Sequence, residues 1–418
     1  MPIYLANADY LDAQTCSVTR TSLRVDEGSG GGIELLDELP ADVEAVDCTG
    51  RIVTRSFVIG HHHIYSALAR GMPPPPSPPT NFVEILEKIW WRLDKALDKN
   101  MIRASALAAG VDAALAGTTF IIDHHASPNA ATDSLHIIAE ALETVGLSHL
   151  LCYELSDRDG PERLEQGLAE TQRYLENHQG LVGLHASFTV GDELLERAMD
   201  LARAHKTGLH VHVAEAEADQ VDCLTKHGKR CVQRFADAGA LELSQTILAH
   251  CIHLDRAERE LIAACQAWVT QQAESNLNNA VGTLDASDFP DRVFIGTDGM
   301  NGDMLAAARS TYLTSRSAEG LSPMAAYRRL RRVHDYLESN QFAGDSGNNL
   351  VLLDYQSPTP VTADNWAAHF VYGLNRSHVE SVISDGRWIV RDRRCTRVDE
   401  DTILAEARQQ AARLWDRL

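Results

Sequence analysis

The sequence has little of what would tie it to a membrane or to nucleic acid. It contains no apolar run that approaches the roughly 18 residues of a membrane-spanning helix. Basic residues are also scarce, with 38 Lys and Arg against 59 Asp and Glu among 418 residues, and the formal net charge is -21. A field of that sign repels phosphate backbones, so the charge argues against nucleic-acid partners and acidic membrane surfaces. We therefore expect a soluble, folded protein.

Motifs that mark several common chemistries are missing as well. The eight cysteines contain no C-x-x-C pair, which fits reduced thiols better than a disulfide framework or a thiolate metal site. Neither a phosphate loop nor a G-x-S-x-G nucleophile elbow occurs. The first residues, MPIYLANADY, lack the basic and apolar regions of a signal peptide, so we expect the cytoplasm as the compartment. What the sequence does contain is 18 histidines, several of them grouped at strand-like positions.

The central part of the chain alternates short apolar runs with helical stretches, a pattern typical of parallel βαβ units. Eight such units would close into a (β/α)8 TIM barrel, and a doubly wound open sheet is the alternative. The eight predicted strands are residues 56–60, 118–123, 149–155, 180–186, 208–215, 246–253, 267–272 and 292–299.

Both ends of the chain are also rich in predicted strands. Short strands joined by turns fill the first 54 residues, and strands recur at 349–355 and 378–399, where Asp385-Gly386 has the sequence of a hairpin turn. We therefore expect two domains. Residues 1–54 and 346–418 would build a β domain, and residues 55–345 would form the barrel.

Histidines follow the first predicted barrel strand. Side chains alternate along a strand, so His61 and His63 share one face and His62 takes the other. If that face is the barrel interior, two imidazoles converge at the carboxyl end of the strand, where barrel active sites lie. An H-x-H pair by itself is equally compatible with hydrogen-bonded core histidines, so the argument depends on the other strands.

Two later strands add candidates. In the fifth, His210 and His212 share a face, and we expect the outer His212 to be a ligand. Glu215 follows where that strand ends, where a carboxylate could shuttle protons, although a solvated acidic loop is the alternative. In the sixth, His250 and His253 are three residues apart and cannot both point inward. We expect His250 to face the site and His253 to orient a loop.

Asp298 ends the eighth predicted strand, in a glycine-flanked turn. Alone it would be read as a helix N-cap, but beside strand-end histidines it becomes a candidate ligand and base. We expect His61, His63, His212 and Asp298 to surround one divalent metal, which would acidify water toward neutral pH. Zinc is the expected ion, and iron suits the same donors.

Four motifs stand at the ends of these strands: H-x-H after strand one, H-x-H-x-x-E after strand five, A-H-C-x-H-L after strand six and G-T-D-G after strand eight. Together they resemble the amidohydrolase superfamily, in particular its mononuclear deaminase and chlorohydrolase branch. The resemblance spans essentially the whole chain. Longer strings are similar to SsnA-type aminohydrolases: WWRLDKALDKN, IIDHHASPN, CYELSDRDG, ESNLNNAVG and DYQSPTPVTADN.

The resemblance implies a distorted (β/α)8 barrel with a small β-sandwich domain built from both chain termini. It implies that the four ligands hold one metal ion, because GLHASFTVG has no lysine where binuclear relatives carry one after strand four. His250 would polarise the hydrolytic water or hold the tetrahedral intermediate, Glu215 would pass protons to the leaving nitrogen, and Asp298 would take the proton of the water.

Four further residues are candidate substrate contacts, although ordinary hydrogen bonding within the barrel would also explain them: His125, His185, Gln271 and Asn276. The chain departs from the family pattern in three places, one of them FAGDSGNN before the strand at 349–355. Arg55-Ser56 stands where relatives carry Pro-Gly, which concerns only how the chain enters the barrel. Gln271-Gln272 stands where relatives carry His-Asn, which bears on the substrate.

The leading hypothesis is therefore a metal-dependent hydrolase that attacks a non-peptide C–N bond of a small nitrogen-rich cyclic compound, as a deaminase does. Hydrolysis of a cyclic amide, or halide displacement from a triazine-like ring, is the alternative with the same site. A catalytically silent metal-binding scaffold is the alternative of another class, and Glu215 argues against it. The expected partners are a small-molecule substrate and, from the resemblance alone, further copies of the chain.

Overall fold

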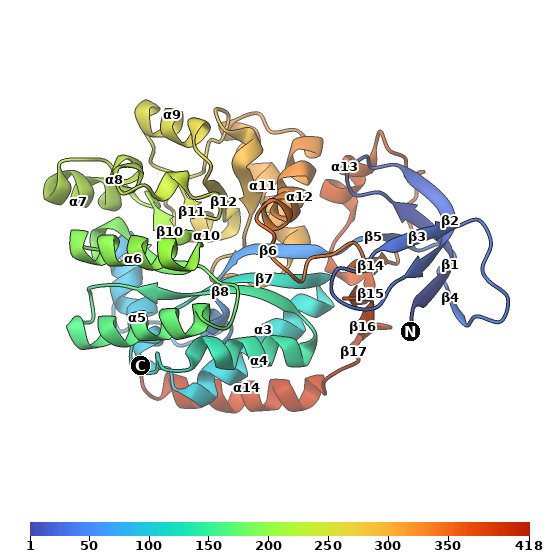
Figure 1. The fold of residues 1–418 in the computed structure, drawn as a ribbon, viewed down its shortest axis with the longest axis horizontal. Helices are drawn as coiled ribbons and strands as arrows, with labels where there is room; N and C mark the ends of the chain where they lie inside the picture. The colour runs from blue at the N-terminus through green and yellow to red at the C-terminus, as the bar shows by residue number, and fades with distance from the viewer.

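The computed structural model describes residues 1–418 as a barrel and a separate sheet (Figure 1). All eight predicted barrel strands are present. They pair in parallel and in chain order, as eight consecutive βαβ units require. The strands are β6 (Phe57–His62), β7 (Thr118–His125), β8 (Ser148–Leu155), β9 (Val182–Ala186), β10 (Leu209–Val213), β11 (Ile247–His250), β12 (Trp268–Gln271) and β13 (Val293–Ile295).

The last strand meets the first through a few backbone contacts, so the sheet is a nearly closed barrel and the open-sheet alternative is wrong. His62 forms a parallel bridge with Asp298. The carbonyl of His61 accepts from the amides of Thr297 at 2.8 Å and Asp298 at 3.0 Å, and the amide of His63 donates to the carbonyl of Asp298 at 3.1 Å. This closure brings the two ends of the central segment together at the predicted ligands.

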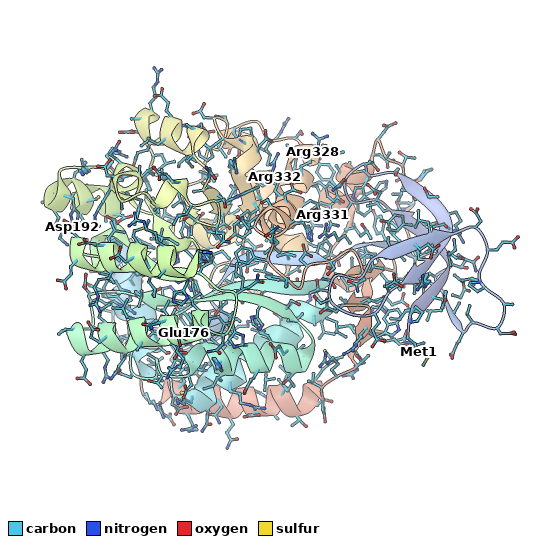
Figure 2. All side chains as sticks on the ribbon, in the orientation of Figure 1. Met1, Glu176, Asp192, Arg328, Arg331 and Arg332 are labelled. Atoms are coloured by element: carbon cyan, nitrogen blue, oxygen red, sulfur yellow. The ribbon has the colours of Figure 1, made fainter.

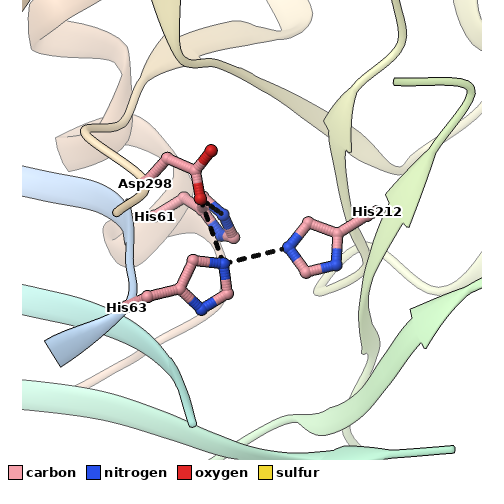
Figure 3. Close-up of side chains that lie close together, drawn as sticks. All are labelled: His61, His63, His212 and Asp298. Atoms are coloured by element: carbon pink, nitrogen blue, oxygen red, sulfur yellow. Dashed lines mark hydrogen bonds and ion pairs between the residues drawn. The ribbon is translucent and has the colours of Figure 1, made fainter. Parts of the chain in front are cut away.

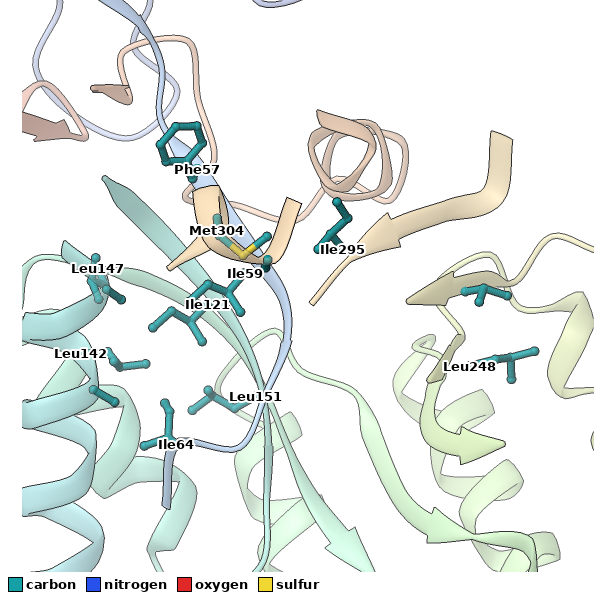
Figure 4. Packing of buried hydrophobic residues seen from close by; sticks show 14 of the residues in the cluster. Phe57, Ile59, Ile64, Ile121, Leu142, Leu147, Leu151, Leu248, Ile295 and Met304 are labelled. Atoms are coloured by element: carbon teal, nitrogen blue, oxygen red, sulfur yellow. The ribbon is translucent and has the colours of Figure 1, made fainter. Parts of the chain in front are cut away.

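Helices cover the outside of the barrel (Figure 1). Strand residues such as Ile59, Ile121 and Leu151 belong to the same hydrophobic cluster as Leu142 and Leu147 (Figure 4). Leu142 lies on helix α4, and Leu147 follows that helix. The helices are α3 (Lys99–Leu115), α4 (Ser134–Val145), α5 (Pro161–Leu175), α6 (Asp192–His205), α7 (Glu217–His227), α8 (Cys231–Asp237), α9 (Arg256–Ala264), α10 (Ala273–Asn278), α11 (Met304–Ala318) and α12 (Pro323–Ser339). None of the helices combines the length and apolar character needed to cross a bilayer.

The segment after β6 forms a wall of short helices. The 3-10 helix η1 (Ile64–Ala69) leads into a proline-rich stretch at residues 72–80, MPPPPSPPT. This stretch is followed by α1 (Phe82–Ile85), the π-helix η2 (Leu86–Trp90) and α2 (Trp91–Ala96). Other short helices are η3 (Ser187–Thr189), η4 (Ala240–Glu242), η5 (Pro290–Arg292), α13 (Trp366–Ala368), the π-helix η6 (His369–Gly373) and η7 (Arg376–His378).

Both chain ends contribute to the separate nine-stranded sheet. Strand β5 pairs antiparallel with β14, which joins the amino-terminal strands to the carboxyl-terminal ones. Asp385 and Gly386 have φ angles of 49° and 69°, as a two-residue hairpin turn requires, so the predicted hairpin is present. The strands are β1 (Ile3–Leu11), β2 (Val18–Val25), β3 (Ile33–Leu36), β4 (Ala45–Asp47), β5 (Ile52–Arg55), β14 (Leu350–Leu353), β15 (Val379–Ser384), β16 (Arg387–Arg391) and β17 (Arg394–Cys395).

The chain enters the barrel where β5 runs into β6, and helix α12 holds this point. Figure 2 shows Arg328, Arg331 and Arg332 close together on α12. Of these, Arg331 is buried and donates hydrogen bonds to the carbonyls of Arg55 at 2.9 Å and Ser56 at 2.7 Å. Charge-assisted hydrogen bonds to these carbonyl oxygens therefore hold the chain just before the first barrel strand begins.

The last helix, α14 (Glu400–Trp415), was not anticipated from the sequence. It lies against α3 of the barrel and not on the terminal sheet (Figure 1), and the indole of Trp415 donates to the carbonyl of Leu68 at 2.8 Å. The domain boundaries at residues 54/55 and 345/346 stay a prediction. Helix α14 belongs to the terminal segment in sequence but packs on the barrel.

Candidate active site

The four predicted ligands lie together at the carboxyl ends of the barrel strands (Figure 3). His63 Nε2 is 3.1 Å from Asp298 Oδ1 and 3.2 Å from His212 Nε2. His61 Nε2 is 3.5 Å from the same Asp298 oxygen. All four residues are buried, and one donor atom from each lies within 4.8 Å of the others. Two further groups of three residues extend this cluster: His124 and Glu154 with His212, and Glu215 and His250 with Asp298.

The Nδ1 atom of each of the three rings has a hydrogen-bond partner on the side away from the cluster. His63 Nδ1 bonds the carbonyl oxygen of His124 at 2.6 Å, and His212 Nδ1 bonds that of His185 at 2.7 Å. A carbonyl oxygen only accepts, so both Nδ1 atoms carry the proton. His61 Nδ1 meets His210 Nε2 at 2.8 Å, and His61 Nε2 has no hydrogen-bond partner. When His63 and His212 are neutral, this arrangement turns their Nε2 lone pairs toward a shared centre, where His61 Nε2 also lies.

This donor set fits a divalent cation. Three imidazole nitrogens and one carboxylate, each oriented by a second hydrogen bond, are typical of a zinc or iron site in a protein. The balance of charge points the same way. Burial opposes a charge on His63, yet its hydrogen bond to Asp298 raises the pKa of His63 to about 9. Burial lowers the pKa of His61 to about 3, so in the bare cluster the positive charge that Asp298 requires falls on one ring.

The strand ends that supply the site have an unusual backbone. Ala214, His250 and Asp298 have φ angles of 50°, 73° and 56°, in the left-handed region that residues other than glycine rarely adopt. Such conformations are held by the surrounding structure and are concentrated at functional sites. The amide of Ala214 donates to Asp219 at 2.9 Å, which holds one of these turns.

Glu215 and His250 lie beside the cluster, as predicted. His250 Nε2 is 3.4 Å from Glu215 Oε2 and 3.9 Å from Asp298 Oδ2. Burial lowers the pKa of His250 to about 4, so the ring is neutral near pH 7. Burial and the negative charge of Asp298 raise the pKa of Glu215 well above its usual value. A carboxyl group with a raised pKa keeps its proton to higher pH, which favours a role as general acid.

A cavity opens in front of these groups. Its opposite wall comes from the short helices that follow β6, and its lining is His63, Tyr65, Phe82, Leu86, Trp90, Trp91, Asp94, Glu154, His185, His212, Glu215, His250, Ser275, Asn279, Asp298 and Gly299. Aromatic and acidic side chains therefore share the pocket.

The four predicted substrate contacts are placed differently. Only His185 lines the cavity, and its Nδ1 lies 2.6 Å from Thr189 Oγ1. His125 bonds Ser127 at 2.9 Å and lies outside the lining. Asn276 bonds His250 at 2.8 Å.

Gln271 also lies outside the cavity lining. Its side chain bonds Ser315 at 3.0 Å and Arg329 at 2.7 Å, on helices α11 and α12. It is a buried structural link between β12 and the outer helices, and not a contact at the cavity.

Three charged residues around the cavity were not singled out from the sequence. Glu154 ends strand β8, and Asp94 lies on α2. Arg158 is bonded to Asp94 and lies 3.5 Å from Glu154. Burial raises the pKa of Asp94 to about 7. The strand-end position that identified the ligands also applies to Glu154, whereas nothing in the sequence marks the placement of Asp94.

Comparisons with known proteins agree with the geometry. Residues 52–329 match the model of the Amidohydrolase family. The 5-methylthioadenosine/S-adenosylhomocysteine deaminase of Desulforamulus reducens is 27% identical over 395 residues, covering 89% of this chain and 88% of that protein.

Two solved structures share the fold. An adenosine deaminase from Xanthomonas campestris with bound zinc has a TM-score of 0.83 and 18% identity, covering 99% of this chain and 98% of that one. The atrazine chlorohydrolase of Arthrobacter aurescens complexed with zinc has a TM-score of 0.82 and 16% identity, covering 98% of this chain and 100% of that one.

Proposed function

The chain belongs to the amidohydrolase family and is a hydrolase of carbon–nitrogen bonds other than peptide bonds, and we propose that it is a deaminase of a small nitrogen-rich heterocycle. The observation that carries the proposal is the contact of Glu215 and His250 at 3.4 Å, beside a cluster of three histidines and Asp298. This arrangement offers a proton donor and a neutral imidazole at one edge of an aromatic cavity. A proton donor assists the departure of an amine from a ring carbon, and an imidazole N–H can stabilise the negative charge that develops.

We propose that His61, His63, His212 and Asp298 hold one divalent ion, with zinc first and iron second. When bound, the ion would supply the Lewis acidity that makes water nucleophilic near neutral pH. The structure of the relative from Xanthomonas campestris contains zinc, which supports that order.

Three side chains would carry out the proton transfers and stabilise the charge that develops. Asp298 would accept a proton from the attacking water. Its carboxylate faces the cluster, and its contacts with His61 and His63 keep its pKa low against the effect of burial. His250 would donate from Nε2 to the ring nitrogen or oxygen beside the reacting carbon, where negative charge develops as the carbon is attacked. Glu215, whose carboxyl group lies 3.4 Å from His250, would deliver its proton to the departing nitrogen.

The cavity wall supports a flat, polar substrate. Trp90 and Trp91 offer faces against which a ring can stack, while His185, Glu154 and Asp94 offer polar contacts. Because the relative from Desulforamulus reducens is named for adenosine derivatives, aminopurines and their nucleosides are the first compounds to test.

The experiment is a product screen with metal-analysed protein. Purified protein is assayed for zinc and iron and then incubated with purines, pterins, triazines and hydantoins. Ammonia release from an amino-substituted ring supports the proposal. Halide release or a new carboxylate would replace it with dehalogenation or ring opening, and a metal-loaded protein inert to every compound would favour a scaffold.

The proposal also covers compartment and assembly. All eight cysteines are unpaired, six of them buried, which suits a reducing compartment such as the cytoplasm. Assembly into a homo-oligomer follows from the family resemblance, and light scattering of the purified protein tests it.

A further inference from the structure

Helix α10 and the residue that follows it contact all three groups proposed to move protons. Ser275 Oγ donates to Asp298 Oδ2 at 2.5 Å, Asn276 Nδ2 donates to His250 Nδ1 at 2.8 Å, and Asn279 Nδ2 lies 3.4 Å from Glu215 Oε1. We infer that α10 is a positioning element, in which Ser275 sets the rotation of the Asp298 carboxylate and Asn276 sets the tautomer of His250. This inference rests on the proposed function for the roles of the groups that are held.

The spacing along the helix explains how one short element reaches three partners. Residues four apart lie on the same face of a helix, so Ser275 and Asn279 point the same way, and their side chains are 3.5 Å apart. Asn276 is next to Ser275 and turns toward β11. Ser275 and Asn276 are buried, and the amide of Asn276 donates to the carbonyl of Gln272 at 2.9 Å. The helix is therefore anchored where it makes these contacts.

Ser275 decides which oxygen of Asp298 faces the histidines. A carboxylate can rotate and present either oxygen, but the hydroxyl of Ser275 occupies Oδ2. Oδ1 is left 3.1 Å from His63 Nε2 and 3.5 Å from His61 Nε2. Without the hydroxyl the carboxylate would lose this preference, and the ligand set would be less well arranged for a cation.

Asn276 decides where His250 carries its single proton. An amide N–H that donates to Nδ1 requires a lone pair on Nδ1, so the proton of a neutral ring must be on Nε2. The other side of the ring agrees. Nε2 lies 3.4 Å from Glu215 Oε2 and 3.9 Å from Oδ2 of the ionised Asp298 carboxylate. An N–H is favourable beside the Asp298 oxygen, whereas a lone pair would be repelled by its negative charge.

This tautomer is the one that the reaction needs. With the proton on Nε2, His250 points a donor at the cavity, where negative charge would develop during attack on a ring carbon. With the proton on Nδ1, the same ring would point a lone pair at that charge. Asn276 does not line the cavity, so it acts through His250 as a positioning residue and not as a substrate contact.

The first test uses Asn276→Asp, which keeps the size of the side chain but replaces the donor with an acceptor. Histidine-selective ¹⁵N NMR of the zinc-loaded protein reports which ring nitrogen of His250 is protonated, and His250→Gln identifies the signal. We expect Nε2 to be protonated in the wild type and Nδ1 in Asn276→Asp. We also expect kcat to fall about 10- to 100-fold, with KM changed less than about threefold and zinc content unchanged.

Two variants on the same helix complete the test. Ser275→Ala should weaken zinc binding about tenfold or more, and Ser275→Thr, which keeps the hydroxyl, should restore most of it. Leu277→Ala, at a side chain 56% exposed on α10, is the control for helix integrity and should match the wild type. The thermal unfolding midpoint of each variant shows whether it is folded.

The outcomes separate this inference from the proposed function. Tautomer and zinc affinity are measured without substrate, so a protein that releases no ammonia but shows both effects would refute only the proposed function. A wild-type His250 protonated on Nδ1, or equal zinc affinity in wild type and Ser275→Ala, would overturn the inference. Wild-type kcat in a folded Asn276→Asp variant would overturn it as well.

Discussion

His63 Nε2 and His212 Nε2 face each other across 3.2 Å, although both rings already commit their Nδ1 protons to carbonyl oxygens. Two nitrogen lone pairs at that distance repel unless a proton or a cation lies between them or beside them. Asp298 Oδ1, 3.1 Å from His63 Nε2, adds a negative charge to the same point. The ends of strands β6, β10 and β13 therefore bring together side chains that repel one another unless a positive charge lies among them.

Removal of a single ligand should empty the site. We expect His61→Ala and Asp298→Ala to abolish stoichiometric metal binding and turnover, because each change removes one of the four donors and leaves the other three oriented for a four-ligand site. Elemental analysis after dialysis against a chelator measures the metal. His205→Ala, at the end of helix α6, is the matched histidine control and should keep a full equivalent. Full metal content in either ligand variant would show that the site is assigned wrongly.

Glu215→Gln should separate metal binding from chemistry. The amide keeps the size of the side chain but has no proton to deliver to a leaving nitrogen, so we expect kcat to fall by about 10²- to 10⁴-fold while metal content is unchanged. The control is Glu217→Gln, which should behave as wild type because Glu217 begins helix α7 and its side chain is 78% exposed. Near-normal turnover in Glu215→Gln would remove Glu215 from the mechanism.

Asp94→Asn should change substrate binding and leave the metal in place. Asp94 lines the cavity and is bonded to Arg158. Loss of its negative charge would weaken the charge-assisted hydrogen bond to Arg158 at this wall of the cavity. We expect KM to rise about tenfold, corresponding to about 1.4 kcal/mol. Asp159→Asn is the control, because Asp159 lies 3.0 Å from the same Arg158 but does not line this cavity. Equal KM values for the two variants would assign Asp94 a structural role only.

Gly60→Ala should destabilise the fold. A Cβ at Gly60 would lie 2.4 Å from the ring of Phe294 and 2.6 Å from the carbonyl oxygen of Ile295, and the backbone cannot move without disturbing the closure of the barrel. We expect the free energy of unfolding to fall by about 3 kcal/mol, measured by urea denaturation. Gly32→Ala, where a Cβ meets nothing within 4 Å, should change it by less than about 0.5 kcal/mol. Equal stabilities would show that the barrel can relax around the added methyl group.

The parts of the site that follow strand periodicity could be predicted from the sequence. Alternation along a strand separated His61 and His63 from His62, and the convergence of strand ends in a barrel placed His212 and Asp298 with them. The side chains that hang on loops and short helices could not be placed in this way. Asp94 is buried in the cavity wall because a π-helix and α2 turn it inward, and no local pattern marks that turn.

Composition and local pattern were enough to identify a barrel with a histidine-rich mouth, because hydrophobic periodicity and residue chemistry are properties of short segments. Tertiary structure alone decided which of several plausible polar residues face the cavity. Gln271 sits next to the mouth in sequence, yet it turns outward because Ser315 and Arg329 satisfy its amide there. Asn276 turns toward His250, and α14 returns to pack on α3. These choices depend on partners tens to hundreds of residues away, which become neighbours only when the barrel closes.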